Sequence, residues 1–219
     1  MRVGISRIHF PITTLGPGRR LGIWFQGCSI RCPGCISADT WATGRGLLNL
    51  DELLERLESW LLECDGITIS GGEPFDQCDA LIELLRGMRA KVGVDILVYS
   101  GHPFERLGEP LVRMDGLIDA LITDPYHVDA PQTLPLRGSD NQRLHILTAL
   151  GRERFATFED PQRCEQTFDV MFDDDGAVWL AGIPRRGDFE RLRERLGQLG
   201  HRILTSEDAS PPLCGAGQA

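Results

Sequence analysis

The sequence predicts an α/β fold that is followed by a small α+β appendage at the C-terminal end. Short apolar runs alternate with segments whose leucines recur at helical spacing, over residues 1–150. Strands that are separated by helices usually pair in parallel through right-handed crossovers. Beyond residue 150 this alternation stops. We therefore expect a core over residues 1–150, an appendage over residues 151–205 and a disordered tail over residues 206–219.

Two strands and a helix are expected at the start of the core. Residues 2–10 alternate loosely and residues 20–26 are apolar, with a Gly-Pro-Gly turn between the two runs. From Leu50 to Leu61 apolar residues recur at helical spacing. Asn49 stands in the capping position and acidic residues fill the first turn, so we predict a helix here.

The alternation continues to residue 123. Residues 66–70 predict a buried strand that ends in Gly71-Gly72-Glu73-Pro74, and residues 79–90 predict a helix. A strand over residues 94–99, a short helix from residue 104 and a strand over residues 120–123 follow.

The appendage has a different pattern. Two strands, residues 168–172 and 177–180, flank an acidic turn at residues 173–176 that ends in Gly. Residues 188–199 predict an amphipathic helix.

Composition limits the classes of partner. The formal net charge of −9 and the lack of a basic stripe exclude nucleic acid as the expected partner. No apolar run approaches the roughly 20 residues that span a bilayer, and the N-terminus does not resemble a signal peptide. We expect a cytoplasmic protein without a membrane partner, whose seven cysteines are ligands and free thiols rather than disulfides.

Cys28, Cys32 and Cys35 lie within eight residues, directly after the second predicted strand. Three thiolates without an obvious fourth suit a [4Fe–4S] cluster that leaves one iron open, because cubane clusters normally take four cysteines. The competing interpretation is structural zinc, which takes four ligands and usually two Cys pairs. Here one Cys-x-x-Cys pair is present and His102 is a distant fourth candidate, so the pattern favours iron and sulfur.

The Gly71-Gly72-Glu73-Pro74 turn permits two interpretations. It is either an ordinary turn in which the glycines supply positive φ, or a close backbone approach to a ligand, with Glu73 available to an ammonium group. It follows a strand, as the cysteine loop does, so both should lie at the carboxyl edge of the sheet, where sites collect. Ser100 and Asp124 end the next two strands and either hold a cation or a ribose hydroxyl or cap their own turns.

The combination of Cys-x₃-Cys-x₂-Cys and Gly-Gly-Glu-Pro resembles the radical S-adenosylmethionine superfamily. The resemblance implies an open partial (β/α) barrel of about five or six parallel strands. It also implies that S-adenosylmethionine chelates the open iron, and that an electron from the cluster cleaves it to a 5′-deoxyadenosyl radical that abstracts a hydrogen atom. By the same resemblance Cys28, Cys32 and Cys35 are the ligands. The implied cofactor-binding residues are Gly34, Gly71, Gly72, Glu73, Ser100 and Asp124.

Further segments are similar to the activating enzymes of anaerobic ribonucleotide reductase, which are glycyl-radical-enzyme activases. The best of these markers is Leu-Arg-Gly-Ser-x-Asn-Gln at residues 136–142, and the similarity covers residues 1–147. It implies a protein substrate that receives a glycyl radical. The sequence has no second set of clustered cysteines, so we predict a single cluster and an external reductant such as flavodoxin. Ile36, Ser37 and the long C-terminal segment depart from the pattern, and the last implies a different partner or an added regulatory contact.

Two alternatives belong to other classes. A radical enzyme that acts on a small molecule, similar to 7-carboxy-7-deazaguanine synthase, is disfavoured by the segment at residues 136–142. An iron–sulfur interaction module without turnover is disfavoured by the intact Glu73 and the complete set of three cysteines.

Overall fold

The computed structural model describes residues 1–163, 167–172 and 178–201. The predicted acidic turn at residues 173–176 and the predicted tail at residues 206–219 lie outside the described residues.

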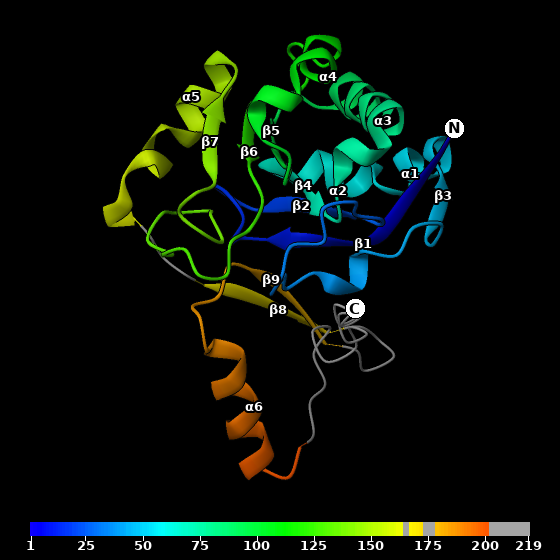
Figure 1. Cartoon of the computed structure of the whole chain (residues 1–219). Coiled ribbons are helices and arrows are strands. Elements are labelled where there is room, and N and C mark those ends of the chain that lie inside the picture. Colours follow the sequence, from blue (N-terminus) through cyan, green and yellow to red (C-terminus); the bar gives the residue numbers. More distant parts are fainter. Residues whose placement is uncertain (164–166, 173–177, 202–219) are drawn as a thin grey trace, which may run out of the picture.

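A mixed seven-stranded sheet forms the centre of the molecule, with strand order β3-β1-β2-β4-β5-β6-β7 (Figure 1). Its strands are β1 Arg2–Ile12, β2 Arg20–Phe25, β3 Leu47–Asn49, β4 Gly66–Gly71, β5 Asp95–Tyr99, β6 Ala120–Thr123 and β7 Arg143–Ile146. The α/β class is thereby confirmed, whereas closure into an open partial barrel stays a prediction.

The prediction of five or six parallel strands is wrong. In the sheet of the described chain, the strands that pair in parallel are β2, β4, β5 and β6. Strands β1 and β2 are antiparallel, and so are β1 and β3, and β6 and β7. The link between β1 and β2 spans residues 13–19. A parallel pair needs a crossover of about a dozen residues or more, so this link only allows the chain to turn back.

The helices α1 to α4 follow the predicted pattern. They are α1 Leu50–Arg56, α2 Glu58–Glu63, α3 Cys78–Lys91 and α4 Gly108–Arg113. The helix predicted from Leu50 to Leu61 is present as two consecutive helices. Asn49 caps α1 as predicted, because its side chain accepts hydrogen bonds from the amides of Asp51 and Glu52.

The main core lies between the sheet and helices α1 to α4. Alternate residues of the central strands face it, as the period of two requires, and in β5 these are Ile96 and Val98. Leu97 and Tyr99 face the other side of the sheet and pack with Phe155 of α5 Ala149–Phe155.

A buried charge network ties three parallel strands together on this second side. Arg20 at the start of β2 has no exposed surface, and its Nη2 donates to Asp95 Oδ1 at 2.7 Å. Its Nε donates to the hydroxyl of Thr68 at 2.6 Å, and Arg154 of α5 donates to the second oxygen of Asp95 at 3.0 Å. Nothing local in the sequence marks Arg20 as a core residue.

The C-terminal segment contains the two predicted strands and the predicted helix. β8 Phe168–Phe172 and β9 Val178–Gly182 pair in antiparallel register, and α6 Asp188–Gln198 extends away from the sheet (Figure 1). Asp169 of β8 accepts hydrogen bonds from the amides and hydroxyls of Thr13 and Thr14, which follow β1. The division at residue 150 stays a prediction, and α5 spans that position.

The remaining short elements are 3₁₀ turns. They are η1 Ala38–Thr40, η2 Pro74–Gln77, η3 Phe104–Arg106, η4 Ala156–Glu159 and η5 Pro161–Arg163. Across the described part of the chain, each helix is too short or too polar to cross a membrane.

Candidate functional site

The cysteine loop and the Gly-Gly-Glu turn leave the sheet side by side. β2 and β4 are parallel neighbours, with Phe25 paired to Gly71 at their carboxyl ends. The amide of Gly72 donates to the carbonyl of Phe25 at 2.8 Å, and the amide of Glu73 donates to the carbonyl of Gly27 at 2.8 Å. The turn is therefore bonded to the residue that precedes Cys28.

The glycines of the turn are required by this contact. Gly71 has φ +103°, and a Cβ on Gly72 would lie 2.0 Å from the carbonyl oxygen of Gly27. No side chain fits at that separation, since the obstacle is backbone. The structure thus shows a close backbone approach between the two loops, and a close approach of a ligand to the same glycines stays a prediction.

The carboxylate of Glu73 is buried beneath the turn, with 1% of the residue exposed. It accepts hydrogen bonds from the amide of Phe75 (3.0 Å), the hydroxyl of Ser100 (2.9 Å) and the amide of Gly101 (2.8 Å). Burial raises the pKa of Glu73, and these donors act in the opposite direction. A carboxylate accepts about four hydrogen bonds, and the donors above supply three, so a role of Glu73 toward an ammonium group stays a prediction.

The three cysteines are free thiols on one loop, with Cys28 buried and the other two half-buried. Burial raises the pKa of each, that of Cys35 to about 11. A metal that binds them must therefore displace protons, as thiolate ligation requires. Gly34 has φ +71°, and the amide of Cys35 donates to the carbonyl of Cys32 at 3.1 Å, which closes the turn between them.

Within the described residues, no three His, Cys, Asp or Glu side chains gather tightly enough to hold a single metal ion. An all-thiol donor set is the one that iron–sulfur clusters use, and Cys28, Cys32 and Cys35 supply it. The donor chemistry of the loop therefore fits a [4Fe–4S] cluster.

Asp76 braces the cysteine loop and was missed by sequence reasoning. Its carboxylate accepts from the amide of Ser29 at 2.7 Å and from the hydroxyl of Ser29 at 2.8 Å. Nε2 of His102 lies 3.6 Å from the same carboxylate. The only sequence signal was position, since Asp76 closely follows the Gly-Gly-Glu turn and Ser29 directly follows Cys28.

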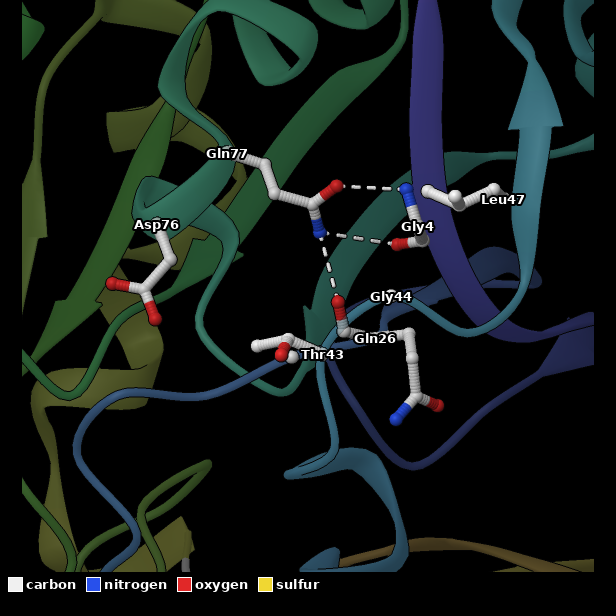
Figure 2. A pocket seen from close by; sticks show the side chains of 8 residues that line it. Gly4, Gln26, Thr43, Gly44, Leu47, Asp76 and Gln77 are labelled. Carbon is white, nitrogen blue, oxygen red and sulfur yellow. Dashed lines mark hydrogen bonds between the residues drawn. The ribbon is translucent and has the colours of Figure 1, made fainter.

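A small cavity lies behind the start of the cysteine loop, with a volume of about 170 Å³. Figure 2 shows the amide of Gln77 reaching across it: Nε2 donates to the carbonyls of Gly4 (3.2 Å) and Gln26 (3.0 Å), and Oε1 accepts from the amide of Gly4 (2.7 Å). Gln77, also missed from sequence, thus ties β1 to the end of β2. The cavity is lined by Gly4, Gln26, Gly27, Thr43, Gly44, Leu47, Asp76 and Gln77.

The structure separates the two outer predicted residues. Ser100 lies against Glu73, whereas the carboxylate of Asp124 accepts from Arg143 Nε at 2.7 Å and from the hydroxyl of Thr123 at 2.8 Å. Asp124 also has φ +83°. Its carboxylate is thus engaged by neighbours on β6 and β7, and a part in cofactor binding stays a prediction.

Comparison with known proteins agrees with this geometry. The model of the family described as 4Fe-4S single cluster domain matches residues 14–145. The anaerobic ribonucleoside-triphosphate reductase-activating protein of enterobacteria phage T4 is 31% identical over 134 residues, which are 59% of this chain and 85% of the phage protein. The protein of that name from Escherichia coli K12 is 29% identical over 64% of this chain and 96% of its own length.

The chain belongs to the radical S-adenosylmethionine activases of glycyl-radical enzymes. A third relative, the pyruvate formate-lyase-activating enzyme of Listeria monocytogenes, is 36% identical over 60% of this chain and 55% of its own length. As an activase of this type the chain is an oxidoreductase that uses a [4Fe–4S] cluster and S-adenosylmethionine. The family match contains the cysteine loop and the Gly-Gly-Glu turn, while β8, β9 and α6 of the activase lie outside it.

Proposed function

We propose that this activase forms a glycyl radical on an anaerobic ribonucleotide reductase. Two relatives that carry that activity in their names align over 96% and 85% of their own lengths. The single observation that carries the proposal is the bond of 2.8 Å from the amide of Glu73 to the carbonyl of Gly27, which places a buried carboxylate at the root of the cysteine loop.

We propose a role for each site residue, and the geometry described above supports these roles. Cys28, Cys32 and Cys35 hold the cluster, and Gly71, Gly72 and Glu73 receive the amino group of S-adenosylmethionine. Ser100 orients Glu73 through its hydroxyl, while Gly34 and Asp124 are the further candidates for cofactor contact.

The bound groups supply the chemistry: one electron from the reduced cluster cleaves S-adenosylmethionine, and the adenosyl fragment removes a hydrogen atom from the substrate. With both groups bound, the cysteines would hold the cluster, Glu73 would hold the amino group of S-adenosylmethionine, and the surrounding loops would exclude water.

The proposed substrate is a protein, reached at the carboxyl edge of the sheet. The proposed electron donor is an external flavodoxin-type protein, because the matched family carries a single cluster. Nucleic acid is not a proposed partner, since the net charge of −9 opposes binding to a polyanion.

The test is reconstitution with iron and sulfide under anaerobic conditions. With dithionite and S-adenosylmethionine the protein should release 5′-deoxyadenosine. With the anaerobic ribonucleotide reductase of the same genome, it should also produce the doublet EPR signal of a glycyl radical.

The two measurements test the radical reaction and the identity of the substrate separately. A protein with an intact cluster that releases no 5′-deoxyadenosine contradicts the radical reaction. Release of 5′-deoxyadenosine without a glycyl radical on the reductase contradicts the proposed substrate and leaves the radical reaction in place.

A further inference from the structure

The indole N–H of Trp41 is buried and makes no hydrogen bond with any described residue. Buried indole N–H groups usually find an acceptor, because a buried donor without one loses the hydrogen bond that it makes to water in the unfolded chain. A buried donor without an acceptor, next to a loop that binds a cofactor, is a group that the bound cofactor can supply with an acceptor.

The backbone of Trp41 is fixed against the cysteine loop. The amide of Cys28 donates to the carbonyl of Trp41 at 3.2 Å, and the amide of Gly27 donates to the carbonyl of Thr40 at 2.7 Å. Thr40 is fully buried, and its hydroxyl donates to the carbonyl of Ser37 at 2.6 Å. The segment that carries the indole ring is thus hydrogen-bonded to the start of the cysteine loop.

Among the three cysteines of the loop, Cys35 is the one whose thiol the side chain of Trp41 faces as a donor. The pair does not reach hydrogen-bond geometry in this structure. A neutral thiol is a weak acceptor, whereas a thiolate accepts strongly, so ligation by iron strengthens this contact.

We propose that Trp41 is a positioning residue for the cluster, whose indole N–H donates a hydrogen bond to Sγ of Cys35 once that sulfur binds iron. The inference rests on the proposed role of Cys35 as a ligand. Hydrogen bonds to the sulfurs are among the factors that set the potential of an iron–sulfur cluster. The bond stabilises the reduced state, which carries one more negative charge, so Trp41 raises the reduction potential and makes the cluster easier for an external donor to reduce.

The experiment compares Trp41→Phe with Trp60→Phe by a redox titration monitored by EPR. Phenylalanine keeps an aromatic ring and removes the N–H. Trp60 lies on α2, is 36% exposed and packs its ring near that of Phe10. Its replacement by phenylalanine makes the same chemical change away from the cysteine loop. At a fixed potential we expect the ratio of reduced to oxidised cluster to fall about tenfold in Trp41→Phe, which is about 59 mV for one electron. Trp60→Phe should match the wild type.

A second measurement on the wild type covers the case in which Trp41→Phe loses its cluster. Protein that contains tryptophan labelled with ¹⁵N at the indole should show a ¹⁵N coupling in pulsed EPR of the reduced cluster. An unchanged potential at equal iron and sulfide content, or no ¹⁵N coupling, overturns the role of Trp41 alone. A wild-type protein that binds no iron overturns the proposed cluster site together with this inference.

Discussion

The hydroxyl of Ser100 donates a hydrogen bond of 2.9 Å to Oε1 of Glu73, joining the carboxyl ends of β5 and β4. The second oxygen of Glu73 accepts from the amide of Gly101, the next residue after Ser100. Two strands thus orient one buried carboxylate, and a change in either alters the Gly-Gly-Glu turn.

Glu73→Gln should weaken the binding of S-adenosylmethionine by about 10- to 100-fold, because a hydrogen bond to a charged group contributes about 1.5–3 kcal/mol. The NH₂ group of the glutamine is itself a donor, so it cannot accept the hydrogen bonds that the carboxylate accepts from its neighbours. Equilibrium dialysis of the reconstituted protein measures the affinity. Glu58→Gln is the control, since Glu58 pairs with Lys91 at the surface. Wild-type affinity in Glu73→Gln would remove Glu73 from the site.

Gly72→Ala should lower the free energy of unfolding by about 1–3 kcal/mol, the usual cost of overpacking. The added Cβ would meet the carbonyl oxygen of Gly27 at 2.0 Å, so the turn and the cysteine loop must separate. Gly93→Ala is the matched control, because its Cβ meets nothing within 4 Å. Urea unfolding measures both variants. Equal stability of the two would show that the loops separate without cost.

Asp76→Asn should release iron to a chelator about tenfold faster than the wild type. The variant loses one of the two charge-assisted bonds to Ser29, and about 1.4 kcal/mol corresponds to a factor of ten. Absorbance of the chelator complex follows the release. Asp79→Asn is the control, since the side chain of Asp79 is 72% exposed and pairs with Arg113. Identical rates of iron release in Asp76→Asn and the control would mean that the hydrogen bonds from Ser29 to Asp76 do not stabilise the cluster.

Arg20→Met should lower the free energy of unfolding by about 3 kcal/mol, because it leaves Asp95 buried with Arg154 as its remaining ionic partner. Lys91→Met removes the exposed pair with Glu58 and should cost less than about 1 kcal/mol. Guanidinium unfolding at one pH compares them. A loss in Arg20→Met as small as in Lys91→Met would contradict the structural role of the buried pair.

Stability should fall at acidic pH in part through His145. Burial, with Arg143 nearby, lowers the pKa of His145 below its ordinary value of 6.5, so the folded protein binds this proton less readily than the unfolded chain. The contribution is present above pH 6.5 and is lost as the pH falls through the lower folded-state pKa. Urea unfolding from pH 8 to pH 5 should show a shallower decline in His145→Asn. Equal slopes would mean that His145 titrates alike in both states.

The sequence predicted the two motifs of the site and their proximity for a physical reason. Cys28 and Gly71 each follow an apolar strand, and parallel strands end at one edge. Most helices could also be predicted, because leucine spacing and the Asn49 cap are local signals. The directions of β1, β3 and β7 could not be derived from local patterning alone.

The residues that hold the site in place could be recognised only from the tertiary structure. Asp76 and Ser29 are 47 residues apart, and Arg20 and Asp95 are 75 apart, so no periodicity relates either pair. Nothing local in the sequence indicates that the indole N–H of Trp41 is buried.

The sequence by itself determined the chemistry, since ligand type and spacing are local properties: three cysteines in eight residues and a Gly-Gly-Glu turn. The tertiary structure alone decided what Glu73, Asp76 and Trp41 touch. Those contacts depend on the order in which strands pair and on which groups that order leaves buried, and both are settled only when the whole sheet is assembled.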